Sequence, residues 1–89
     1  MEKFIVFGTY CEDVIKKRKP YREEHLNRLS NLKERDILIT LGPTKCSKYL
    51  FGIFNGNNEN EVRDILEKDI YWEKGIWISI DIYPWVQVF

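Results

Sequence analysis

The stretch Gly75–Trp85, GIWISIDIYPW, is the clearest guide to the fold because its apolar residues recur with a strict two-residue period. Isoleucine occupies every second position from residue 76 to residue 82, and the positions between hold aromatic and polar residues: Trp77, Ser79, Asp81 and Tyr83. Successive side chains of a β-strand point to opposite faces of the sheet. The pattern therefore predicts a strand whose isoleucine face packs against helices, while Trp77 and Tyr83 point to the other face.

The remaining elements follow upstream. Residues 3–10, KFIVFGTY, are apolar on both alternating faces, as in a central strand covered on both sides. Helix formers after Pro20 predict a helix over about residues 19–35, and Asn58 is a suitable cap for a second helix that ends near Asp69. Two β-rich stretches lie between the helices, DILITLGP (36–43) and KYLFGIFNG (48–56), and a short helical turn, IYWEKG, follows Asp69.

The order β-α-β-β-α-β is that of a ferredoxin-like α+β fold, an antiparallel sheet with both helices on one face. With 89 residues the chain is expected to form a single domain over residues 1–89, near the size at which such a unit leaves hydrophobic surface uncovered. The other face of the sheet then needs a cover. A second copy of the same sheet is the natural one, which predicts a homodimer enclosing a partly polar barrel.

Composition excludes several classes of function. Fourteen basic residues balance fourteen acidic ones, which argues against a nucleic-acid-binding protein, and no apolar run approaches the roughly 20 residues of a membrane span. A single histidine, with no other metal ligand at a suitable spacing, is also a poor basis for a metal site.

The cysteines and the N-terminus indicate the compartment. Cys11 and Cys46 form no CxxC motif, and the N-terminus lacks the pattern of a signal peptide. We therefore expect free thiols and a cytoplasmic protein.

The candidate site lies in the basic stretch KKRKPYREEHLNRL, residues 16–29. At about 100° per residue, Arg22 and His25 share a stripe with Leu29 and Leu32, and Arg18 lies at or just before the helix start. Histidine can accept a proton near neutral pH, and arginine can bind a carboxylate through two hydrogen bonds. The stripe predicts proton transfer on a small anionic molecule. The alternatives are a structural histidine within the core and solvated basic side chains.

Five elements in order carry a family resemblance: Arg18-x-x-x-Arg22-x-x-His25-Leu26, then LITLGP, then Asp69-x-Tyr71, then Lys74-Gly75-Ile76, then IYPW. Together they resemble the YciI-like (YCII-related) family over nearly the whole chain. The resemblance implies a dimeric α/β barrel, usually a homodimer, with His25 and Asp69 as a catalytic dyad. Family members with an assigned reaction act on small ring acids or phenolic compounds without a metal, which implies that no cofactor is needed.

The chain departs from the family pattern at two positions. The proline that usually follows the aspartate is Ile70, and the glycine before the second strand is Asp36. Asp69 could equally cap the following turn instead of orienting His25.

The sequence leaves two classes of function open. One is a cofactor-free lyase, isomerase or dehydrochlorinase in which Arg18 or Arg22 binds the substrate; the other is a non-catalytic homodimer that binds a small metabolite or is purely structural.

Overall fold

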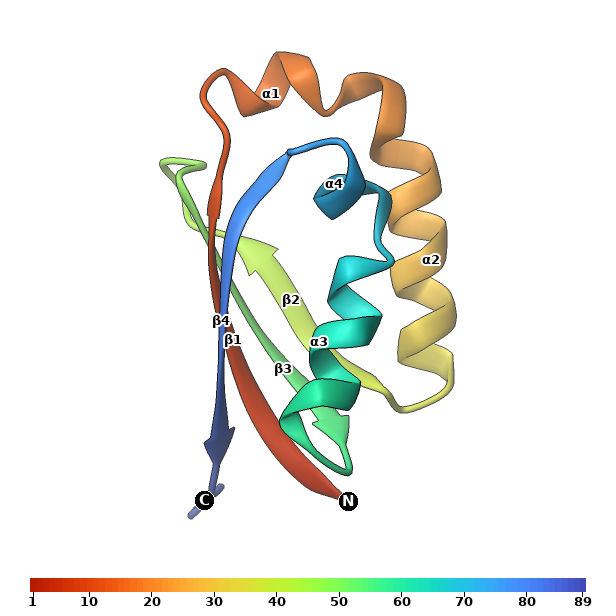
Figure 1. Cartoon of the computed structure of the whole chain (residues 1–89), viewed down its shortest axis with the longest axis vertical. Helices are drawn as coiled ribbons and strands as arrows, with labels where there is room; N and C mark the ends of the chain where they lie inside the picture. The colour runs from red at the N-terminus through yellow and green to blue at the C-terminus, as the bar shows by residue number, and fades with distance from the viewer.

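The computed structural model describes residues 1–89 and has one four-stranded antiparallel sheet in the order β2-β3-β1-β4. Helices α2 and α3 pack on one face of this sheet, and the other face is uncovered (Figure 1). This is the predicted ferredoxin-like arrangement. The elements in chain order are β1 (Glu2–Tyr10), α1 (Val14–Lys17), η1 (Lys19–Tyr21), α2 (Arg22–Glu34), β2 (Leu38–Pro43), β3 (Tyr49–Gly56), α3 (Glu59–Glu67), α4 (Ile70–Glu73) and β4 (Trp77–Trp85).

Strand β1 lies at the centre of the sheet between β3 and β4. Its side chains alternate as the sequence predicts: Phe4 and Val6 are buried under the helices, whereas Ile5 and Phe7 lie on the opposite face. That face is not covered within the chain, and Phe7 is 45% exposed. The exposed Phe7 ring lies on the central strand, so the single chain has an uncovered hydrophobic surface at the middle of its sheet.

The first helical region begins earlier than expected and is divided. The turn α1 and the short η1 precede α2, and Pro20 lies in the first turn of η1, where its missing N–H costs no hydrogen bond. At the other end of α2, the Ile37 N–H donates to the Leu32 carbonyl at 3.0 Å. Asp36 adopts the left-handed φ of 57° that this helix ending requires. Glycine adopts that conformation more readily than aspartate, which explains why the family has glycine at this helix end.

Strand β4 differs from the sequence prediction in one important respect. Trp77 is 1% exposed on the helix side, whereas Ile78 is 57% exposed on the other face. The register shifts here, because Thr9 pairs with Ser79 while Tyr10 pairs with Trp77, which leaves Ile78 as the extra residue of a β-bulge. The predictions that Trp77 points away from the helices and that Ile78 packs against them were therefore wrong, because the extra residue reverses the alternation on the N-terminal side of the bulge.

Beyond the bulge the predicted alternation holds. Ile80 and Ile82 are buried under the helices, and Tyr83 is 53% exposed on the uncovered face. There Tyr83 contacts Phe7 edge to face at a centroid distance of 6.3 Å, and Phe51 of β3 contacts Phe7 at 5.3 Å. The uncovered face thus has an aromatic centre. No helix in the structure is both long and apolar enough to cross a membrane.

Candidate functional site

Asp69 lies between α3 and α4 and is completely buried. Its Oδ1 accepts a hydrogen bond from the Tyr71 N–H at 2.9 Å and so caps the N-terminus of α4. The same Oδ1 lies 2.7 Å from Nδ1 of His25, which comes from α2. The cap and the dyad contact were alternatives from sequence, but one oxygen makes both. Ile70 takes the first helical position without displacing the aspartate.

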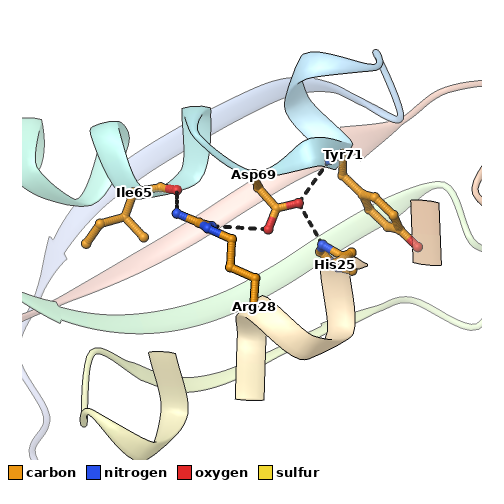
Figure 2. A network of polar contacts seen from close by, with 5 residues as sticks. All are labelled: His25, Arg28, Ile65, Asp69 and Tyr71. Carbon is orange, nitrogen blue, oxygen red and sulfur yellow. Dashed lines mark hydrogen bonds and ion pairs between the residues drawn. The ribbon is translucent and has the colours of Figure 1, made fainter. Parts of the chain in front are cut away.

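A third residue, which was not predicted from the sequence, completes this contact. Nη1 of Arg28 donates to the other Asp69 oxygen, Oδ2, at 3.2 Å (Figure 2). Nη2 of Arg28 donates to the carbonyl oxygen of Ile65, in the last part of α3, at 2.8 Å. The buried carboxylate is therefore paired with a charge that is itself anchored, which offsets the cost of burying it. Spacing could have indicated Arg28, because it follows His25 by three residues on one helix face.

The contacts of Asp69 decide which nitrogen of His25 carries a proton. A carboxylate only accepts hydrogen bonds, so Nδ1 donates to Oδ1. Nε2 makes no hydrogen bond within the protein. The only buried side-chain nitrogen or oxygen atoms without a partner are Tyr71 Oη and Trp77 Nε1, so Nε2 of His25 keeps contact with solvent. Its lone pair is thus free to accept a proton from a bound molecule.

Two aromatic rings hold the imidazole in this orientation. Tyr71 stacks on His25 with a centroid distance of 3.6 Å and an interplanar angle of 7°, and Trp77 meets it edge to face at 5.2 Å. Both rings are almost fully buried. The bulge in β4 that turns Trp77 inward therefore also builds one wall around His25. A ring confined in this way loses little further freedom when a ligand binds.

His25 faces a cavity of about 390 Å³ between the start of the α2 region and the end of β2. The polar residues that line it include His25, Arg18, Arg22, Lys45, Tyr10 and Tyr71. Three predicted site residues are thus brought together around one cavity, and Asp69 lies behind His25, outside the lining. Arg18 is half-buried, and Arg22 is exposed. The neighbouring lysines at positions 16, 17 and 19 are exposed and do not line the cavity, in line with the solvated interpretation.

The two tyrosines of the cavity keep their protons. Burial raises the pKa of the Tyr71 hydroxyl, and the nearby Arg22 guanidinium opposes part of this shift. Burial likewise raises the pKa of Tyr10. The Tyr71 hydroxyl is buried without a hydrogen-bond partner that satisfies it, close to the Arg22 guanidinium. An unsatisfied hydroxyl at a cavity wall favours polar ligands there.

The cysteines lie outside this cavity, and neither is in a disulfide. Cys11 is partly buried and Cys46 is exposed, and both line a second groove at the other side of Tyr10. A hydrogen bond with the Thr44 hydroxyl at 3.2 Å lowers the pKa of the Cys46 thiol. No three histidine, cysteine, aspartate or glutamate side chains lie close enough together to hold a metal ion.

Comparison with known proteins agrees with the predicted resemblance. The family model of the YCII-related domain matches residues 2–86 of the chain. The chain belongs to the YCII-related domain family. The predicted family membership is thereby confirmed, and the match includes all four strands and the helices between them.

Two similar proteins extend this result for the YCII-related chain. A protein of Haemophilus influenzae (strain ATCC 51907 / DSM 11121 / KW20 / Rd) named "Uncharacterized protein" is 27% identical over 96 residues, covering 97% of this chain and 98% of that protein. Among solved structures, 5-chloro-2-hydroxyhydroquinone dehydrochlorinase (TftG) from Burkholderia phenoliruptrix AC1100, in complex with 2,5-dihydroxybenzoquinone, superposes with a TM-score of 0.79. It is 20% identical, with 94% of this chain and 93% of that chain covered, so this likeness concerns the fold.

Proposed function

We propose that this protein is an enzyme of the lyase, isomerase or dehydrochlorinase type that transfers a proton on a small anionic or phenolic substrate. One observation carries the proposal: the line of contacts from Arg28 through Asp69 to His25, which ends at a free Nε2 facing a cavity. A carboxylate that orients an imidazole and stabilises its protonated form is a recurrent arrangement for general acid–base catalysis. In this proposal His25 and Asp69 are the catalytic pair, with no cofactor required.

The reaction starts when Nε2 of His25 removes a proton from a carbon or hydroxyl of the substrate. When the proton comes from a carbon, the electron pair of the C–H bond passes to the neighbouring carbonyl oxygen and an enolate forms; when it comes from a hydroxyl, the pair stays on that oxygen as a phenolate. The imidazolium formed is stabilised by Asp69, whose charge is held in place by Arg28. In an isomerase the proton returns to another substrate atom; in a lyase or dehydrochlorinase a leaving group departs with its electrons, and His25 releases the proton to solvent.

Charged and hydroxyl groups around the cavity suit the developing anion. Arg18 and Arg22 line the cavity and can hold a carboxylate or enolate oxygen, and the Tyr71 hydroxyl can donate to the same group. The dehydrochlorinase with the same fold was solved with a small ring compound, which is consistent with a ring-sized substrate for a cavity of about 390 Å³. The substrate class in our proposal rests on these two points.

Deuterium incorporation from heavy water tests the proposal even while the substrate is unidentified. Purified protein is incubated in D₂O with mixtures of small carboxylates and phenols, and mass spectrometry records which compounds change mass or structure. We expect at least one compound to gain deuterium or lose a leaving group faster than in buffer alone. A broad collection in which compounds bind yet none changes would contradict an enzymatic role.

One observation favours the second function, a binding protein without turnover. His25 is only 5% exposed and is stacked against Tyr71, as a structural histidine would be. In that case ligands would be retained by the protein and recovered chemically unchanged from D₂O. The same mass-spectrometric experiment therefore separates the two functions.

We further propose that two chains associate through their uncovered sheet faces. The proposal is supported by the aromatic centre of that face, where Phe7, Phe51 and Tyr83 are each at least 40% exposed and the Phe7 ring contacts the other two. Paired residues across β1 place polar groups beside these rings, such as Asp81 opposite Phe7. A surface that mixes rings with polar groups can pack on its own copy about a two-fold axis.

Phe7→Asp should convert a dimer into monomers, because it places a charge at the centre of the proposed interface without disturbing the buried face of β1. Light scattering coupled to size exclusion at micromolar concentration measures the mass of wild type and variant. Leu26→Asp is the matched control, since Leu26 is 43% exposed but lies on α2, on the helix side. A monomeric wild type, or equal effects of the two variants, would refute the sheet-to-sheet dimer.

A further inference from the structure

The charge around the candidate cavity is strongly one-sided. Arg18, Arg22 and Lys45 line the cavity, and no aspartate or glutamate does so. The whole chain has equal numbers of basic and acidic residues, so this excess is local. None of the three cations forms an ion pair within the protein, whose salt bridges involve only His25, Arg28 and Arg63 as bases. Because no acidic side chain of the protein pairs with these cations, the cavity has a local excess of positive charge that favours an anion.

The three cations come from two separate parts of the chain. Arg18 and Arg22 flank η1, at the start of the α2 region, whereas Lys45 lies in the loop between β2 and β3. That loop is a closed turn, because the Ser47 N–H donates to the Thr44 carbonyl at 2.9 Å and the Thr44 N–H donates to the Tyr49 carbonyl at 2.8 Å. The turn fixes the backbone on both sides of Lys45, and the exposed Lys45 side chain lines the cavity from this turn.

We infer that the site binds a small dianion, with one anionic group held by Arg18 and Arg22 and the second by Lys45. The inference rests on the proposed function and specifies its substrate class. A single carboxylate bound by the two arginines would leave the lysine uncompensated, whereas a second carboxylate or a phenolate on the same small ring would neutralise it. Lys45 is a binding residue that the sequence analysis did not identify.

The Tyr71 hydroxyl is a second observation that points to the same kind of ligand. Tyr71 is 2% exposed, lines the cavity, and its hydroxyl has no hydrogen-bond partner in the protein. A tyrosine hydroxyl is protonated at neutral pH, and burial raises the pKa of Tyr71 further, so its O–H is a donor beside Arg22 that an anionic oxygen can satisfy. An oxygen-rich dianion satisfies this donor as well as the cations, which an apolar or cationic ligand would not.

Binding of phthalate and monomethyl phthalate tests the inference with matched probes. Both have the same ring and substitution, but at pH 8 phthalate carries two negative charges and its monomethyl ester carries one. Titration calorimetry at low salt should show wild type binding phthalate about tenfold more tightly than the ester, the effect expected of one charge-assisted hydrogen bond. The preference should shrink as salt is added, because the contact is electrostatic.

Two lysines of the same loop provide a matched pair of variants. Lys45→Met should remove most of the preference for phthalate, whereas Lys48→Met should keep it, since Lys48 is exposed and lines the other groove. Both variants lose one positive charge at an exposed position, and circular dichroism verifies that both are folded. Equal effects of the two variants, no preference for phthalate in wild type, or no measurable binding of either probe would each overturn the inference.

The experiment separates this inference from the proposed reaction. Calorimetry reads anion binding without turnover, so His25→Gln protein should retain the preference for phthalate while losing proton transfer. A dianion preference in a protein that incorporates no deuterium into any bound compound would leave the binding assignment intact and refute the enzymatic one. If instead only monoanions gained deuterium and Lys45→Met had no effect, the enzymatic proposal would be supported and the dianion inference would be refuted.

Discussion

His25→Gln is expected to lower the rate of proton transfer by a factor of about 10² to 10⁴, the usual contribution of a positioned general base. Glutamine can still donate a hydrogen bond to Asp69 from its amide, so the buried carboxylate keeps a partner and the fold should survive. What is lost is the basic Nε2 at the cavity. The measurement is the rate of deuterium incorporation into a compound that the wild type processes, with the fold followed by circular dichroism.

The matched control is Lys33→Gln, an exposed position on the same helix, outside the cavity lining, which should leave that rate unchanged. A His25→Gln protein as active as wild type would show that another group is the base. If the variant mainly unfolds instead, His25 is a structural residue of the interface between helix and sheet. Either result would remove the main support for the enzymatic proposal.

Trp77→Ala is expected to cost about 3–5 kcal/mol in the free energy of unfolding, the typical effect of truncating a fully buried large aromatic side chain. The physical reason is the cavity left beside Tyr71 and His25, both of which contact the Trp77 ring. Ile78→Ala, one residue further, should cost no more than about 1 kcal/mol, because that side chain is largely exposed. Urea unfolding at one protein concentration measures both.

This pair of variants tests the β-bulge directly. Without the bulge, the alternation of β4 would place Ile78 under the helices and Trp77 on the uncovered face, and the order of the two effects would be reversed. A larger loss for Ile78→Ala than for Trp77→Ala would therefore contradict the register of β1 and β4 in the structure.

Much of the architecture could be predicted because it depends on local pattern. The two-residue period of β1 and of the second half of β4 was confirmed by burial of Val6, Ile80 and Ile82. Asn58 caps α3 as expected, with its side chain accepting the Glu61 N–H at 2.9 Å. Caps and alternation involve residues within a few positions of each other, so the sequence contains all the partners that decide them.

The candidate site was predicted only in part. The stripe on α2 correctly placed His25 and Arg22 at one cavity with Arg18. Arg28 and Lys45 were missed, although Arg28 follows His25 by a single helical turn. Helical spacing shows that two residues share a face, but it does not show which buried carboxylate that face will meet.

Local sequence was enough to establish the order of strands and helices, the caps at Asn58 and Asp69, and the helix face that contains His25. Three-dimensional packing was needed to place Trp77 inside and Ile78 outside, and to bring Asp69 to His25, 44 positions away, together with Arg28. The reason is that a bulge is set by the strand opposite it, and a buried ion pair by the packing of separate helices. The opposite strand and the second helix both lie outside the short stretch of sequence that shows an alternating pattern or a helix cap.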